Sequence, residues 1–191
     1  MMRTMMVVVV AAGLAAPACG GNDRMATVDA AGSVVGTGTV IGPMAAAGPV
    51  AILWLVDSMP SDYSYKFGDG TATATMFTAS PPSDPPEAAR TRATSVDIGV
   101  GIMVLLHAGA SLPDGALISR PNAIGYSLQY ALIYRGQDDA GTAIGWTAAF
   151  PVGLSCGKCV GSASGLDTFK PVDCAMLVID TNPSAPACNW N

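Results

Sequence analysis

Four cysteines near the end of the chain have the residue type and spacing closest to a chemical site. Two residues separate Cys156 from Cys159, and 14 and then 13 residues separate Cys159, Cys174 and Cys188. Structural zinc sites normally use two close cysteine pairs, and only the first pair is close here. A redox Cys-x-x-Cys needs a helix that lowers the thiol pKa, and the Gly/Ser-rich stretch that follows is no helix. The spacing therefore predicts two disulfides in an oxidising compartment.

The pairing of these four cysteines stays open among three arrangements. A bond between Cys156 and Cys159 would close a very tight ring, so we favour Cys159–Cys174 together with Cys156–Cys188. Each bridge is expected to stabilise the fold by about 2–4 kcal/mol.

Candidate catalytic residues are few. Ser155 stands in Gly153-Leu154-Ser155-Cys156-Gly157, which formally matches the G-x-S-x-G turn of serine hydrolases. That turn needs a following helix and a later histidine, whereas the single histidine, His107, comes earlier. Carboxylates in turns are common, so they give only a weaker hydrolase alternative. Its candidate pairs are Asp57/Asp62 and Asp138/Asp139. We expect no catalytic residue, no metal and no cofactor.

Aromatic side chains suggest a binding surface instead. A shallow platform for a ligand would use four of them: Trp54, Tyr63, Tyr65 and Trp146. Tyr126, Tyr130 and Tyr134 recur at strand spacing, which is typical of packing on one face of a sheet and, less often, of a platform for sugar or peptide.

The first 19 residues have the layout of a secretory leader. Arg3 precedes an apolar run from Met5 to Ala16, and small residues lead to Cys19. The run is about a dozen residues long, whereas a membrane-spanning helix needs roughly 20. The box Ala16-Pro17-Ala18-Cys19 resembles the end of bacterial lipoprotein leaders.

The lipoprotein resemblance implies a signal peptide over residues 1–18 and a lipid on Cys19, which becomes the first residue. Residues 19–32 then form a tether, and the membrane is a partner through the lipid. Gly20 after the cysteine implies the outer membrane if the cell has two membranes. Lipidation would also explain the odd fifth cysteine. The alternative is ordinary cleavage near Ala18, which leaves a soluble secreted protein.

The composition and charge of the chain limit the classes of partner that it can bind. The formal net charge is −5, and removing residues 1–18 takes away one base and no acid, which leaves −6. Nucleic-acid binding rests on clustered Lys and Arg, and this chain has nine such residues without a cluster. We therefore expect no nucleic-acid partner. The 22 glycines and 14 prolines favour a turn-rich β protein.

Residues 33–191 read as one domain of about 7–8 strands. The Gly-rich stretch 33–41, expected at a sheet edge, and the apolar stretch 50–56, expected to be central, faintly resemble the start of transthyretin-like extracellular sandwiches. Gly68-Asp69-Gly70 predicts a hairpin turn. Gly99 and Gly101 share a strand face on which something must pack closely. The expected strands are 33–41, 50–56, 63–67, 71–76, 98–106, 126–134, 143–150 and 174–180.

Because each of these strands has an apolar face to cover, we expect an all-β, two-sheet antiparallel sandwich, Ig-like or transthyretin-like in outline. The expected function is a lipid-anchored surface or periplasmic module with a non-enzymatic binding or structural role. The alternative is a carbohydrate- or peptide-binding lipoprotein. The protein or carbohydrate partner is unknown from the sequence.

Overall fold

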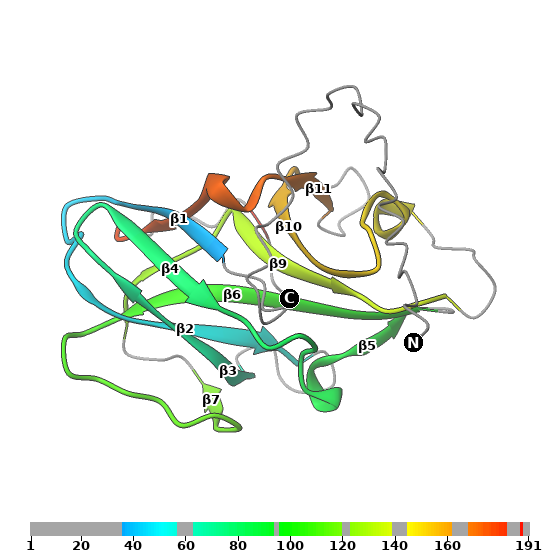
Figure 1. Cartoon of the computed structure of the whole chain (residues 1–191), viewed down its shortest axis with the longest axis horizontal. Helices are drawn as coiled ribbons and strands as arrows, with labels where there is room; N and C mark the ends of the chain where they lie inside the picture. The colour runs from blue at the N-terminus through cyan, green and yellow to red at the C-terminus, as the bar shows by residue number, and fades with distance from the viewer. Residues whose placement is uncertain are drawn as a thin grey trace, which may run out of the picture.

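The computed structural model describes residues 36–56, 63–93, 96–119, 123–138, 145–161, 168–182 and 188, and these residues form an all-β fold, as predicted (Figure 1). Three short 3-10 turns connect its strands: η1 (Glu87–Ala89), η2 (Gly145–Ala149) and η3 (Cys174–Met176). The twelve strands in this part of the chain are β1 (Gly36–Ile41), β2 (Gly48–Leu55), β3 (Tyr63–Ala72), β4 (Met76–Ser80), β5 (Thr91–Ala93), β6 (Val96–Leu106), β7 (Leu117–Ser119), β8 (Ala123–Tyr126), β9 (Tyr130–Arg135), β10 (Gly153–Cys159), β11 (Phe169–Val172) and β12 (Leu177–Asp180).

The described strands belong to one continuous sheet, and seven of them close it into a barrel. The ring runs β6–β2–β3–β4–β1–β12–β8 and returns to β6. Its neighbouring strands are antiparallel except β1 and β12, which pair in parallel from Gly38↔Leu177 to Ile41↔Asp180. The predicted two-sheet sandwich is therefore wrong. β1, expected at an edge, has a partner on each side, because the first and last strands pair with each other.

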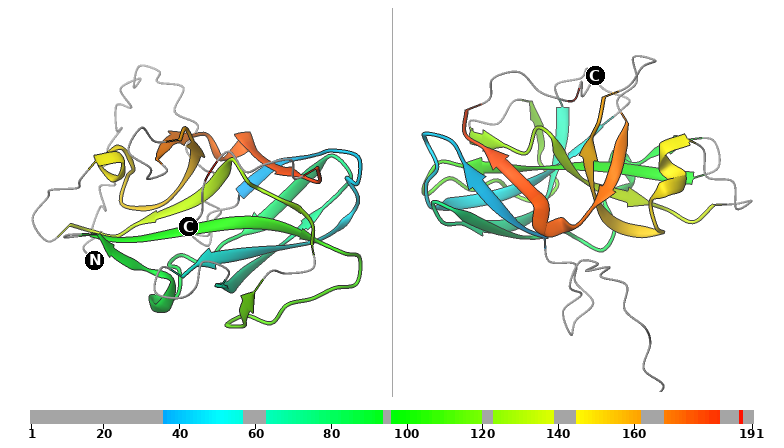
Figure 2. Two further views of the ribbon diagram at one scale, coloured as in Figure 1. Left: turned by 180° about the vertical axis from the view of Figure 1, so that it is seen from behind. Right: turned by 90° about the horizontal axis from the view of Figure 1, so that it is seen from above.

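β6 makes the closure possible because two strands share one of its edges. Ile98–Gly101 pair with β9, whereas Val104–Leu106 pair with β8. The other edge of β6 pairs with β5 and then with β2. β9, β10 and β11 continue the sheet beyond the barrel as a three-stranded extension (Figures 1 and 2).

The main core lies inside the ring and continues along the extension, where β9 and β10 contribute Leu132 and Cys156. Its buried residues include Val40, Ile52, Trp54, Phe77, Met103, Leu105, Leu177 and Ile179. A Cβ at Gly101 would lie 3.0 Å from the Trp54 ring, and one at Gly99 would lie 2.8 Å from Pro85. The prediction that something packs closely over these two glycines is therefore confirmed.

Two smaller clusters cover outer faces of the sheet. The first packs Ala51, Leu53, Val104 and Leu106 against residues of the 107–119 segment, which includes β7. The second packs Ala131, Ile133, Phe150, Cys159, Phe169 and Cys188 with Trp146 of η2. β2 contributes to both the main core and the first outer cluster, so its predicted central position is confirmed.

Several local predictions are wrong: the described residues form twelve strands where 7–8 were expected, the predicted strand 71–76 spans a turn, and the predicted strand 174–180 begins with η3. Gly68–Gly70 is not a turn, because β3 continues through it. The register with β2 shifts here, since Ala51 pairs with Asp69 but Leu53 pairs with Lys66. The positive φ of Gly68 (104°) therefore belongs to a β-bulge. The hairpin turn lies at 73–75, where Thr73 Oγ1 accepts from Met76 N. The predicted strand 126–134 is interrupted after Tyr126, and the predicted strand 143–150 contains η2, whose Trp146 packs on Phe150 and Phe169.

Two disulfides are present, as predicted, but the favoured pairing is wrong. The bonds join Cys156 to Cys174 and Cys159 to Cys188. Because β10 is a strand, residues three apart point to opposite faces. Cys156 and Cys174 lie in the main core, whereas Cys159 and Cys188 lie in the outer cluster around Phe169. Each face therefore holds its own bridge, and the pairs indicate an oxidising compartment.

Candidate binding site

A small hollow lies where the chain leaves β8 and re-enters the sheet as β9. Its volume is about 230 Å³. Residues from three separate parts of the sequence line it: Ile41, Leu128, Gln129, Tyr130, Val178, Asp180 and Asn182. We call this hollow the β9–β12 hollow.

Strand alternation places the β1 and β12 residues of the hollow. Leu177 and Ile179 of β12 are fully buried in the main core, so Val178 and Asp180 point to the opposite face. In the same way Val40 of β1 is buried and Ile41, its neighbour, is 47% exposed. The parallel pairing sets Ile41 directly beside Asp180 on this outer face.

The rim next to Asp180 is fixed by hydrogen bonds of Thr181. Its backbone N and its Oγ1 both donate to Ile41 O, at 3.0 Å each. Thr181 Oγ1 also accepts from Met44 N at 3.1 Å. The Asp180 carboxylate accepts from Asn182 N at 2.8 Å through Oδ1. These hydrogen bonds hold the rim in place and involve neither the side chain of Asn182 nor Oδ2 of Asp180.

The opposite wall is fixed through Gln129 and Tyr130. Gln129 O accepts from Cys159 N at 2.8 Å, while its side chain is exposed. Tyr130 is half-buried against the main core, and Lys158 Nζ lies 5.6 Å from the centre of its ring. The hollow therefore joins an aromatic ring and three aliphatic side chains to two amides, a carboxylate and a nearby ammonium group.

This set of groups suits binding through hydrogen bonds and apolar contact. Two carboxamides and a carboxylate can donate to and accept from a polar ligand, and the Tyr130 ring offers an apolar face. Within the described residues no group of three or more His, Cys, Asp or Glu could hold a metal ion.

The predicted aromatic platform is not assembled from the residues proposed for it. Trp54 is fully buried in the main core, where its Nε1 donates to Phe67 O at 3.0 Å. Tyr63 and Tyr65 lie on β3, in register with β7. Trp146 lies on η2 and packs against Phe150 and Phe169. Of the tyrosine stripe, Tyr130 alone lines the hollow, since Tyr126 packs in the outer cluster near Leu106.

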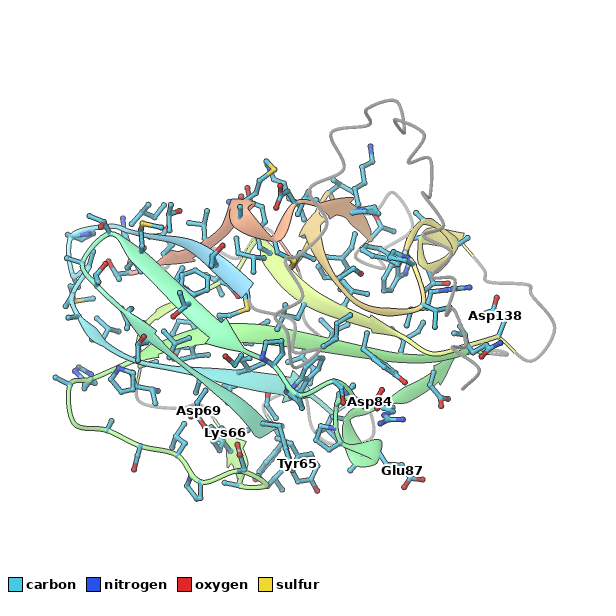
Figure 3. All side chains as sticks on the ribbon, in the orientation of Figure 1. Tyr65, Lys66, Asp69, Asp84, Glu87 and Asp138 are labelled. Atoms are coloured by element: carbon cyan, nitrogen blue, oxygen red, sulfur yellow. A yellow bond between two sulfur atoms is a disulfide. The ribbon has the colours of Figure 1, made fainter. Side chains whose placement is uncertain are left out.

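The candidate catalytic residues that the structure describes are Ser155, His107 and Asp138, and they lie on or after different strands. Ser155 Oγ donates to Ile133 O at 3.3 Å, and His107 is exposed just after β6. Asp138 is held by two hydrogen bonds of 2.8 Å from Arg135 and lies well apart from Asp69 and Lys66 (Figure 3). Asp57, Asp62, Asp139 and the predicted lipid site Cys19 lie outside the described residues.

Two further polar clusters fasten segments to the sheet. The Lys66 side chain is 2% exposed, and its Nζ lies 2.6 Å from Asp69 and 2.8 Å from Asp114 (Figure 3). Elsewhere the Arg90 guanidinium lies 5.0 Å from the centre of the Tyr134 ring. Burial, followed by a hydrogen bond with Asp84, raises the pKa of Tyr134.

Sequence reasoning missed most of the hollow. Gln129, Asp180 and Asn182 end strands or lie between them, and polar residues at such positions are ordinary turn formers. Their meeting depends on the pairing of β1 with β12, which are about 140 residues apart. None of the helical turns in the described residues is long and apolar enough to cross a membrane. Comparison of the chain with protein-family models, curated proteins and solved structures finds no match.

Proposed function

We propose that this chain is an exported, lipid-anchored module of the cell envelope that binds a ligand without catalysis, and that the β9–β12 hollow is its binding site. The observation that carries the proposal is the hollow itself. Its side chains come from β1, β12 and the entry to β9, and those of Gln129 and Asn182 are exposed. Convergent polar groups beside an apolar wall are the usual composition of a ligand site.

Several features support a binding role over a hydrolase. The Asp138 carboxylate forms an ion pair with Arg135, and the Ser155 hydroxyl donates a hydrogen bond to a backbone carbonyl. Each of these groups therefore already has a structural partner. Export is supported by the two disulfides and by the leader that ends at Cys19.

The export half of the proposal is tested by the intact mass of the protein from the membrane fraction, with and without reduction. We expect loss of residues 1–18, added mass from acyl chains on Cys19, and a gain of four hydrogens on reduction of the two disulfides. A cleaved chain without acyl mass would support the secreted soluble form instead of the anchored one.

The binding half is tested by retention of envelope material. The exported protein, as isolated from the membrane fraction, is immobilised and incubated with fragments released from cell envelopes, and the retained material is identified by mass spectrometry. We expect retention by the wild type and its loss in the double variant Gln129→Ala/Asp180→Asn. Gln137→Ala is the matched control, because Gln137 is exposed on the chain beyond β9 and does not line the hollow. Equal retention by the double variant would place the function elsewhere.

A further inference from the structure

We infer that the β9–β12 hollow takes one uncharged pyranose ring of a carbohydrate. The inference rests on the proposed function, since it names the ligand class of that same site. Three properties of the hollow carry it: its size, the charges at and beside it, and its combination of apolar and hydrogen-bonding groups.

The size limits the ligand to a single ring. The hollow measures about 230 Å³, whereas pockets for drug-sized ligands span about 300–1,000 Å³. A pyranose ring is a compact moiety of the size that such a hollow can hold. A longer glycan can enter with one ring and continue into solvent, because the side chains of Gln129 and Asn182 at the hollow are exposed.

The charges select an uncharged ligand. The Asp180 carboxylate lines the hollow and repels phosphate and carboxylate groups. Lys158 lies against the Tyr130 ring, so its ammonium group repels a cation that would stack on that ring. An anion in the hollow therefore meets the Asp180 carboxylate and a cation on the ring meets Lys158, whereas the hydroxyl groups of an uncharged sugar can donate to Asp180.

The lining combines apolar surface with hydrogen-bonding groups, as a pyranose does. A sugar ring presents C–H bonds on its faces and hydroxyls around its edge. Tyr130, Leu128, Ile41 and Val178 offer apolar surface to such a face. Gln129, Asn182 and Asp180 supply paired donors and acceptors, which suit adjacent hydroxyls because each hydroxyl both donates and accepts.

The hollow is also held before a ligand arrives. Thr181 ties the Asp180 rim to Ile41 O, and Cys159 N holds Gln129 O. Cys159 is itself bonded to Cys188. A site whose backbone is already fixed loses less entropy on binding, so even a small ligand with few contacts can bind measurably.

The test is a calorimetric titration of the full exported chain with methyl pyranosides. The uncharged probes are the methyl glycosides of glucose, galactose, mannose and N-acetylglucosamine; the charged probes are methyl glucuronide and glucosamine methyl glycoside. We expect at least one uncharged probe to bind and both charged probes to bind more weakly. Gln129→Ala should weaken the bound probe about tenfold, the loss expected for one or two buried hydrogen bonds. Gln137→Ala should not change it.

Asp180→Asn distinguishes the charge argument from a general disturbance. It keeps an acceptor for Asn182 N and removes the negative charge, so methyl glucuronide should gain affinity relative to the uncharged probe. If no pyranoside binds while envelope retention still depends on Gln129, the ligand class is wrong and the binding function stands. If retention is also independent of Gln129, both fail. Binding that survives Gln129→Ala and Asp180→Asn unchanged would place the sugar outside the hollow.

Discussion

Ser127 and Met103 form a reciprocal pair of hydrogen bonds at the point where the sheet divides. Ser127 N donates to Met103 O, and Ser127 Oγ accepts from Met103 N, each at 2.9 Å. On β6, Gly101 is the last residue paired with β9 and Val104 the first paired with β8. The fully buried serine therefore satisfies the backbone of β6 in the gap between two partner strands.

Replacing Ser127 with alanine should destabilise the fold more than the same replacement at a serine whose partner has other hydrogen bonds. Ser127→Ala leaves the buried Met103 N–H without its acceptor, which costs about 1–3 kcal/mol. The measurement is the free energy of unfolding from urea titration. Ser155→Ala is the control, because the Ile133 carbonyl that Ser155 contacts belongs to a paired strand. Equal losses in the two variants would contradict the bridging role of Ser127.

Gly38→Ala should also be costly, because β1 passes close to two neighbours. A Cβ at this position would collide with the Leu177 carbonyl of β12 and with the Phe77 ring of β4. Overpacking of this kind costs about 1–3 kcal/mol, and here it should loosen the parallel pairing that closes the barrel. Thr39→Ala on the exposed face is the control. If both variants unfold at the same urea concentration, β1 does not lie between β4 and β12 as described.

The disulfide pairing gives a direct chemical test. Digestion without reduction should yield peptides that link Cys156 to Cys174 and Cys159 to Cys188. Removing the second bridge with Cys159→Ala/Cys188→Ala should cost about 2–4 kcal/mol. A linked peptide joining Cys159 to Cys174 would contradict the assignment of the two cysteines to opposite faces of β10.

The sequence was sufficient for features that depend on local pattern. The apolar runs of β2 and β6 predicted buried strands, and the glycines of β6 predicted close neighbours, which are Trp54 over Gly101 and Pro85 over Gly99. The cysteine count predicted two bridges. The strand and glycine signals each lie within a few consecutive residues, and the cysteine count needs only the composition.

Features that depend on distant pairing were beyond the sequence. β10 contains Gly, Ser and Lys and lacks the apolar alternation that predicts a strand. The sequence therefore did not show that Cys156 and Cys159 point to opposite faces, and the cysteine pairing could not be predicted. The Gly-Asp-Gly signal at 68–70 suits a turn and a bulge equally, and only the register with β2 decides. The hollow likewise depends on Ile41 meeting Asp180, which no local pattern records.

Acid should release the 107–119 segment from the barrel through Asp114. A hydrogen bond from the nearly buried Lys66 holds the pKa of Asp114 below its usual range, and Asp114 Oδ1 also accepts from Gly68 N at 3.3 Å. A carboxyl whose folded pKa is depressed stabilises the fold above its unfolded pKa of about 4, and this contribution is lost as pH falls through the folded value. The raised pKa of Lys66 keeps that side chain charged throughout this range.

The measurement is hydrogen exchange at two amides that bind the segment to β3. Gly115 N donates to Lys66 O at 2.9 Å, and Lys66 N donates to Ala116 O at 3.0 Å. At pH 6, Asp114→Asn should exchange faster than the wild type at both amides. The difference should start to shrink below the unfolded pKa of about 4, and it should vanish once the pH has fallen through the lower folded pKa of Asp114, where the wild-type carboxyl is protonated. Asp69→Asn should have the smaller effect, since Asp69 lies on β3 itself and does not tie the segment to it. Wild-type exchange rates in Asp114→Asn would show that the segment is held by its backbone pairing and not by this ion pair.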